Sequence, residues 1–383
     1  MNNFTFENTT RIHFGKNQIE QITKEIPQDK KVLIIYGAGS IKKNGVYEQI
    51  SNALKNHNWG EFSGIEPNPE YATLMQAVEK VKKEKFEYLL AVGGGSVIDG
   101  TKFISAASCY EGEDPWNLIK NQEEVKNALP LSCVLTLPAT GSESNCGAVI
   151  NKDKEKLVFF SSLIRPKFAV LDPSLTFSLS PRQVSNGIVD AFIHVLEQYL
   201  TYPVNAKVQD RFSEGLMLTL LEESQKVFEN PDDLEIRSNI MLSATLALNG
   251  LISSGVPQDW TTHMIGHELT AYCGVDHARS LTVILIAILK VCRKAKEQKL
   301  LQYAKHVFNI DEANLEKSID LAISKTIDFF KQMKMPTSLE EIGLSEKDIE
   351  PILKNLEEHG RTKLGENGDI TIEKSREILL AAI

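Results

Sequence analysis

The chain has 383 residues, of which 42% are hydrophobic and 24% charged, and its formal net charge at pH 7 is −9. This length allows two domains, and the composition is that of a water-soluble globular protein. The excess of acidic residues argues against nucleic-acid binding, because no basic stripe offsets it. No apolar run reaches the ~20 residues that span a bilayer, so we expect no membrane segment.

The five cysteines are scattered and form no CxxC pair, which predicts neither a disulfide framework nor a cysteine zinc site. The N-terminus has no basic-then-apolar signal pattern. We therefore expect a protein of the reducing cytoplasm.

The first 180 residues alternate β-rich runs with helical patterns. Helices are expected at residues 46–56, 70–85 and 97–107, and strands at residues 31–36, 62–65, 88–92, 131–136, 148–151, 157–160 and 168–171. Alternation of this kind predicts a parallel sheet with helices on both faces.

Beyond about residue 181 the pattern changes to one helix after another, punctuated by prolines. We therefore predict an α/β domain over residues 1–180 and an all-helical domain over residues 181–383. A cleft between two such domains is a natural place for a ligand.

The second half of the chain holds a cluster of histidines beside one aspartate. Asp190 and His194 are four residues apart in an apolar helical run, and His263 and His267 repeat that spacing, with His277 close behind. Residues four apart lie on one face of a helix. The spacing by itself leaves two interpretations open, which are a divalent transition-metal site and ordinary surface or core residues of amphipathic helices.

Two glycine-rich turns follow predicted strands of the first half. Gly93-Gly94-Gly95-Ser96 lies before a helix, where backbone N–H groups favour a pyrophosphate, although a tight turn without a ligand would look the same. Gly37-Ala38-Gly39-Ser40 is followed by two lysines and contains no acid, which favours NADP over NAD if a dinucleotide binds there. Ordinary surface lysines are the alternative.

Together these features resemble the iron-containing (group III) alcohol dehydrogenase family over nearly the whole chain. The matching motifs are GGGSVIDGTK at 93–102, TLPATGSESN at 136–145, VLDP at 170–173, SNGIVDAFIHVLEQY at 185–199 and HMIGHELTAYCGVDH at 263–277. Within the family, YGAGSIKKNGVY at 36–47 is similar to the NADPH-dependent butanol dehydrogenase and aldehyde reductase branch. The resemblance implies a dehydroquinate synthase-like fold, with an α/β, Rossmann-like dinucleotide-binding domain over residues 1–180 and an all-helical metal and substrate domain over residues 181–383. As in many relatives, it also implies a homodimer.

The resemblance also assigns site residues. It places one Fe²⁺ or Zn²⁺ ion on Asp190, His194, His263 and His277, and it places His267 near the nicotinamide and the substrate, where it would relay a proton. The positions that match the family's NADP(H) site are Gly37, Gly39, Ser40, Lys43, Asn68, Gly94, Gly95, Ser96, Asp99, Thr136, Thr140, Ser142 and Lys156.

The activity implied is reversible hydride transfer between NADP(H) and a small primary alcohol or aldehyde, such as butanol and butyraldehyde, with the metal polarising the substrate oxygen. One departure affects substrate preference, because Ala278-Arg279 follows the last ligand where many members have glycine. Two other functions are possible. A dehydroquinate synthase-type lyase would need a cluster of basic residues around its substrate, which the helical half lacks. The other is a non-catalytic metal- or cofactor-binding protein that keeps the fold, but all four ligands and the glycine turn are present, so nothing in the sequence indicates loss of activity.

Overall fold

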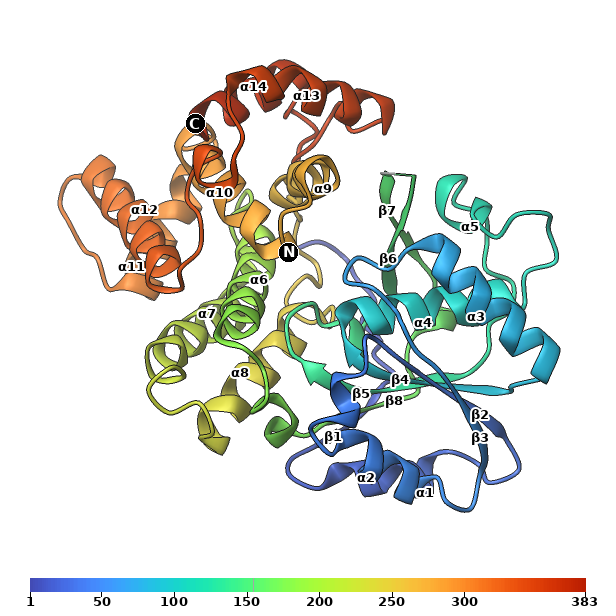
Figure 1. The fold of residues 1–383 in the computed structure, drawn as a ribbon. Helices are drawn as coiled ribbons and strands as arrows, with labels where there is room; N and C mark the ends of the chain where they lie inside the picture. Colours follow the sequence, from blue (N-terminus) through green and yellow to red (C-terminus); the bar gives the residue numbers. More distant parts are fainter. Residues whose placement is uncertain (154) are drawn as a thin grey trace. The chain divides into compact units, whose positions relative to one another are not determined.

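The computed structural model describes residues 1–153 and 155–383, which form two compact units (Figure 1). The sheet unit comprises residues 7–180 and 230–245. The helical unit comprises residues 1–6, 181–229 and 246–383. The predicted division at residue 180 is one of the points where the chain passes from one unit to the other. A short N-terminal segment and an internal segment also change units, and the sequence pattern gave no sign of either.

A parallel six-stranded sheet forms the centre of the sheet unit, in the order β1-β8-β5-β4-β2-β3. β6 and β7 form a separate antiparallel pair. The strands are β1 Arg11–Phe14, β2 Lys31–Tyr36, β3 Asn58–Phe62, β4 Tyr88–Gly94, β5 Leu131–Leu137, β6 Gly147–Lys152, β7 Glu155–Phe160 and β8 Phe168–Leu171.

Helices cover both faces of this sheet, as the sequence predicts. Figure 1 shows α1 (Ile22–Glu25) and α2 (Val46–Ala53) on one face and α3 (Tyr71–Glu84) and α4 (Gly95–Ser108) on the other. Alternate residues of β2 pack into the two apolar clusters, so this strand is buried on both sides. Burial on both faces explains why the sequence of this central parallel strand, KVLIIY, is a continuous apolar run after its first residue. This unit also contains the short α5 (Asn117–Lys120) and, through residues 230–245, most of α8 (Leu234–Ala247).

Two edge strands differ from the sequence expectation. β3 runs over Asn58–Phe62 and not over residues 62–65, and β1 was not predicted at all. Both are short, lie at opposite edges of the sheet and have partly exposed residues, so neither gives a continuous apolar signal. Gly60 in β3 is needed for packing, because a Cβ there would lie 2.9 Å from the ring of Phe86.

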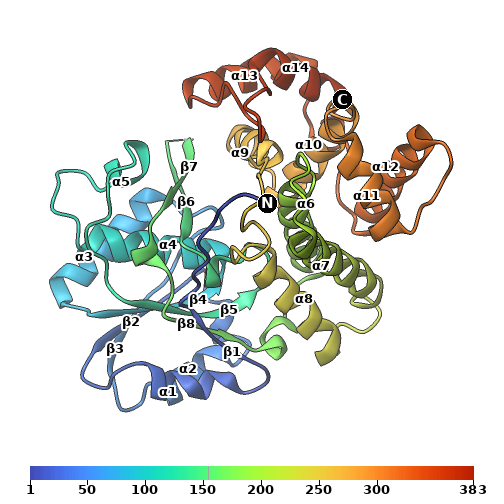
Figure 2. The same cartoon turned by 180° about the vertical axis from the view of Figure 1, so that it is seen from behind.

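The helical unit holds most of the segments in which the sequence predicts successive helices (Figure 2). The exception is residues 230–245, which form most of α8 and belong to the sheet unit. α9 and α10 pack against each other, and α10 also contacts α6. Among the described residues, no helix combines the length and the hydropathy that crossing a bilayer requires. The helices from residue 181 onward are α6 Pro181–Tyr199, α7 Lys207–Lys226, α8 Leu234–Ala247, α9 Thr261–Cys273, α10 His277–Val291, α11 Glu297–Phe308, α12 Leu315–Gln332, α13 Ile349–Glu358 and α14 Ile372–Ala381.

Candidate functional site

Three helices of the helical unit bring the four predicted metal ligands together. α6 supplies Asp190 and His194, α9 supplies His263, and α10 begins at His277. Ligand atoms of Asp190, His263 and His277 all lie within 4.8 Å of one another. His194 is beside this group, since its ring stacks on that of His263 with 4.5 Å between the centroids.

Asp190 lies at the centre of this arrangement. Its side chain is 4% exposed, and within residues 1–153 and 155–383 no hydrogen bond reaches its Oδ1. That oxygen lies 3.7 Å from Nε2 of His277, 3.8 Å from Nδ1 of His194 and 3.9 Å from Nε2 of His263. A buried carboxylate oxygen without a hydrogen bond is costly unless a cation compensates it. The donor set therefore fits a divalent transition metal, and both Fe²⁺ and Zn²⁺ accept carboxylate and imidazole ligands.

Burial prepares one of these imidazoles for metal binding. It lowers the pKa of His194 to about 4, so the ring is neutral at physiological pH. A metal ligand must carry a free nitrogen lone pair, which only the neutral imidazole has. His277 is the most exposed of the three histidines, at 23% of its side chain, and thus marks the more open side of the group.

A carboxylate outside the ligand group fixes the orientation of His263. Glu197 lies on α6, three residues beyond His194, and its side chain is 2% exposed. One of its oxygens contacts Nδ1 of His263, and the other accepts the backbone N–H of Thr262 at 2.6 Å. With Nδ1 engaged by a carboxylate, Nε2 of His263 faces Asp190, which is the arrangement that metal-binding histidines commonly use.

We expect Glu197→Gln to weaken metal binding by about 10- to 100-fold, because an amide holds the imidazole less firmly than a carboxylate. The measurement is a competition titration of the purified protein between zinc and a chelator. Glu223→Gln is a suitable control, since that glutamate is also buried on a helix of the same unit but is not among the groups around Asp190. Equal zinc affinity in wild type and Glu197→Gln would contradict the role given to this carboxylate.

Asp276 ties the start of α10 to α6. Its Oδ2 accepts hydrogen bonds from Nε of Arg182 at 2.7 Å and from Nδ2 of Asn186 at 2.8 Å. Both donors lie on α6, and with Asp190 and His194 they repeat at intervals of four residues. One face of α6 therefore positions His277 as well as supplying two predicted ligands.

His267 lies one turn beyond His263 on α9 and is 5% exposed. Its ring centroid is 5.1 Å from that of His277, but its nitrogens do not belong to the group of ligand atoms around Asp190. Arg279, which the sequence singles out, donates to the backbone carbonyl of Lys334 at 3.0 Å.

The predicted cofactor residues all belong to the sheet unit, and several lie at the carboxyl ends of its strands. Gly94 ends β4 and Gly95 begins α4, whose first turn has no side-chain cap, so its N–H groups can bind an anion. A Cβ on Gly95 would lie 2.5 Å from Oγ1 of Thr140. Glycine is therefore required where this turn approaches Thr140.

Polar contacts link other predicted cofactor residues. Asn68 accepts a hydrogen bond from Nζ of Lys156 at 2.9 Å, and its backbone N–H donates to Oγ of Ser96 at 3.2 Å. Asp99 accepts from Oγ of Ser142 at 2.5 Å and from the backbone N–H of Val149 at 3.0 Å. Both oxygens of Asp99 therefore bind the protein itself.

Sequence reasoning missed Lys102 beside them, which is fully buried and donates to the same Ser142 at 2.9 Å. Its place three residues after Asp99 in the glycine-rich motif was the available signal. Thr136 lies near the end of β5 and is partly buried.

The two lysines that follow the second glycine-rich turn have different surroundings. Gly39 has φ of 93°, and Ser40 begins a short 3₁₀ helix that ends at Lys42. Nζ of Lys42 lies 3.1 Å from Oε1 of Glu61 and 4.7 Å from the centroid of the Tyr47 ring. Lys43 is exposed. A Cβ on Gly37 would meet the backbone oxygen of Ile65 at 3.2 Å, so this turn too is closely packed.

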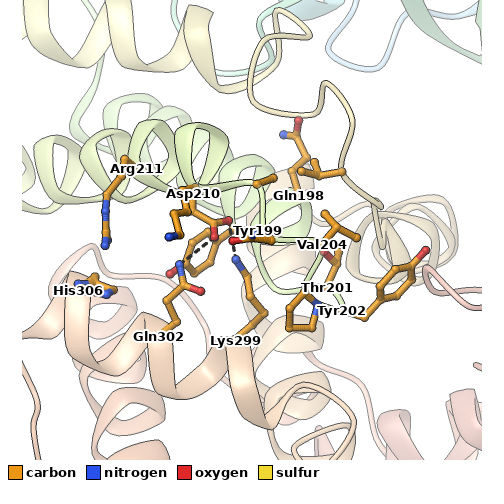
Figure 3. Close-up of a pocket in the computed structure, with 15 residues that line it drawn as sticks. Gln198, Tyr199, Thr201, Tyr202, Val204, Asp210, Arg211, Lys299, Gln302 and His306 are labelled. Atoms are coloured by element: carbon orange, nitrogen blue, oxygen red, sulfur yellow. Dashed lines mark hydrogen bonds and ion pairs between the residues drawn. The ribbon is translucent and has the colours of Figure 1, made fainter. Parts of the chain in front are cut away.

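A cavity of about 540 Å³ lies elsewhere in the helical unit, at the start of α7 (Figure 3). No predicted ligand or cofactor residue is among the described residues that line it. Two of its basic groups have acidic partners, since Lys299 pairs with Asp210 at 2.6 Å and Arg211 pairs with Glu214. This cavity is thus separate from the predicted site.

The chain belongs to the iron-containing alcohol dehydrogenase family, and it is therefore an oxidoreductase of alcohols and aldehydes. The model of the iron-containing alcohol dehydrogenase domain matches residues 9–173, and that of the family's C-terminal domain matches residues 184–366.

The chain is 54% identical to the NADPH-dependent aldehyde reductase YqhD of Escherichia coli K12, over the full length of both. It is 37% identical to a probable NADH-dependent butanol dehydrogenase of Bacillus subtilis, over 92% of each chain. Among solved structures, the NADH-dependent butanol dehydrogenase A of Thermotoga maritima is 37% identical, with a TM-score of 0.95 over 100% of this chain and 99% of the other. The fold class predicted from the sequence is thereby confirmed.

Proposed function

We propose that this protein is a metal-dependent, NADPH-preferring reductase of small aldehydes such as butyraldehyde. The observation that carries the proposal is the buried Oδ1 of Asp190, which lacks a hydrogen bond among the described residues and faces three imidazoles. A divalent metal bound there would act as a Lewis acid toward the carbonyl oxygen of the substrate.

The residues of this chain would have distinct roles in the reaction. Asp190, His194, His263 and His277 would hold the metal, and Glu197 would keep Nε2 of His263 directed at it. His267, next to His277, would relay the proton that the product oxygen requires through its ring nitrogens, because an imidazole exchanges protons near neutral pH. The uncapped first turn of α4 would bind the pyrophosphate of NADPH.

The direct test is the oxidation of NADPH by the metal-loaded protein in the presence of butyraldehyde, with NADH in a parallel assay. We expect turnover with both, and a higher kcat/KM with NADPH. A protein that binds metal and NADPH but reduces none of a series of small aldehydes would contradict the proposal.

The coenzyme preference is proposed to depend on Lys43. The turn from Gly37 to Ser40 contains no acid to repel a 2′-phosphate, and Glu61 already engages Lys42. We expect Lys43→Ala to raise the KM for NADPH about tenfold, which corresponds to about 1.4 kcal/mol for one charged contact, and to leave the KM for NADH nearly unchanged. Steady-state kinetics with each coenzyme at saturating aldehyde measures both values.

Lys42→Ala is the matched control, and it should change the KM for NADPH much less. If Lys43→Ala affected both coenzymes equally, this lysine would not recognise the 2′-phosphate.

We propose in addition that the enzyme works in the cytoplasm, which the free state of all five cysteines supports.

A further inference from the structure

A buried ion cluster lies close to the candidate metal site in the helical unit. Nζ of Lys296 is 2.8 Å from Oδ2 of Asp259 and 3.1 Å from both carboxylate oxygens of Glu366. It also donates to the backbone carbonyl of Leu200 at 2.6 Å. The three side chains are 5%, 6% and 9% exposed, so the ammonium group is surrounded by acceptors and largely removed from water.

This cluster joins the end of α6 to the start of α9. Leu200 directly follows α6, the helix of Asp190 and His194. Asp259 precedes α9, and its Oδ1 accepts the backbone N–H of Thr261, in the first turn of that helix, at 3.0 Å. The backbone N–H of Asp259 in turn donates to the carbonyl of Glu197 at 3.2 Å. Lys296 therefore contacts both segments that lead to the candidate metal site.

The residue between Asp259 and Thr261 has an unusual conformation. Trp260 has φ of 63°, in the left-handed region that side-chain-bearing residues rarely adopt. Such a conformation is strained and persists only where the surroundings enforce it. Hydrogen bonds on both sides of Trp260 provide this restraint. Asp259 makes those described above, and the Trp260 carbonyl accepts the backbone N–H of Met264 at 3.0 Å.

The Trp260 ring packs against two of the proposed ligands. Its centroid lies 5.3 Å from that of His263 and 6.2 Å from that of His194, with edge-to-face geometry in both cases. A change of backbone conformation that rotated the Trp260 ring would therefore also remove a packing contact from both imidazoles. The conformation of this turn and the orientation of the two rings depend on each other.

We propose that Lys296 is a positioning residue of the metal centre, acting through Asp259 and the turn at Trp260. Without its ammonium group, Asp259 and Glu366 would be two buried carboxylates with no countercharge, and Asp259 would turn away from Thr261 to reach water. The imidazoles of His263 and His194 would then lose the packing contact with the Trp260 ring that limits their motion. This proposal rests on the proposed metal site, but it concerns residues outside the ligand group.

The test compares two buried lysines of the same helical region. Lys296→Met removes the cluster's cation, whereas Lys299→Met removes a lysine that is 6% exposed and pairs with Asp210 at 2.6 Å, on the wall of the separate cavity (Figure 3). Lys296→Met removes the ion pairs with Asp259 and Glu366, whereas Lys299→Met removes the pair with Asp210, and only the first variant is connected to α9. The readouts are the Co²⁺ dissociation constant, measured by chelator competition, the visible absorption spectrum of the Co²⁺ protein, and the melting temperature.

We expect both variants to melt at a lower temperature, but only Lys296→Met to bind Co²⁺ about tenfold more weakly and to show a changed Co²⁺ spectrum. Lys296→Arg, which keeps the charge, should recover most of the affinity. Asp259→Asn, which keeps an acceptor for Thr261 but loses the ion pair, should resemble Lys296→Met and replaces it if that variant does not fold.

Two results would overturn the proposal, namely wild-type Co²⁺ affinity and spectrum in both Lys296→Met and Asp259→Asn, or an equal loss of affinity in Lys299→Met. A wild-type protein that binds no Co²⁺ would instead overturn the metal site itself, so the two failures are distinguishable.

Discussion

His263→Ala is expected to leave a folded protein that neither retains a divalent metal nor turns over aldehyde. His263 is the one proposed ligand on α9, its Nε2 lies 3.9 Å from Oδ1 of Asp190, and its Nδ1 contacts Glu197. Loss of a direct ligand should exceed the 10- to 100-fold weakening that is typical of outer carboxylates. Metal content after dialysis, measured by elemental analysis, and the rate of NADPH oxidation are the two measurements.

His267→Ala is the control for this variant. It removes another buried histidine from the same helix, one turn further on, but one whose nitrogens do not belong to the group around Asp190. We expect it to keep the metal and to lose turnover by about 10²- to 10⁴-fold, the usual contribution of a proton-transfer residue. A His263→Ala protein with stoichiometric metal and full activity would refute both the ligand assignment and the mechanism.

The centre of the sheet could be predicted because burial on both faces leaves a local signal. β2 coincides with the apolar run that the sequence shows, and the predicted strand at residues 88–92 is extended only by two glycines in β4. β1 has the sequence RIHF, with exposed first and last residues, and its identity depends on pairing with β8 more than 150 residues away. Such pairing leaves no periodic pattern in the four residues of β1, so this strand was missed.

The candidate metal site was predictable in part for the same reason. Asp190 and His194 lie in an apolar helix, where a polar pair at a spacing of four residues stands out. The same spacing relates His263 to His267, yet only His263 belongs to the group around Asp190. The packing of α9 against its neighbours decides which of these two positions along the helix lies beside Asp190, and the local spacing carries no information about that packing.

The groups around the ligands were harder to find. Glu197 had a usable signal, because it follows His194 by three residues and lies on the same helical face. Asp259 and Lys296 had none, since they are thirty-seven positions apart and meet only after α9, α10 and α11 have packed. A lysine near a helix start ordinarily predicts a solvated surface, and its burial becomes evident only in the fold.

Removal of the metal with a chelator is expected to abolish turnover and to lower the melting temperature, and both effects should reverse when Zn²⁺ or Fe²⁺ is restored. An ion that binds only the folded state stabilises it by RT ln(1 + [L]/Kd), which is about 2.7 kcal/mol at 100 times Kd and about 4.1 kcal/mol at 1,000 times Kd. The metal increases the free energy of unfolding because the proposed ligands, which come from three separate helices, are not assembled in the unfolded chain. Calorimetry with and without metal measures the shift, and activity recovered with each ion shows which one supports turnover.

His263→Ala should show no stabilisation by added metal. If the chelated wild-type protein kept both its turnover and its melting temperature, then Asp190 would have to be compensated by protonated histidines, and the buried carboxylate would be a structural ion pair.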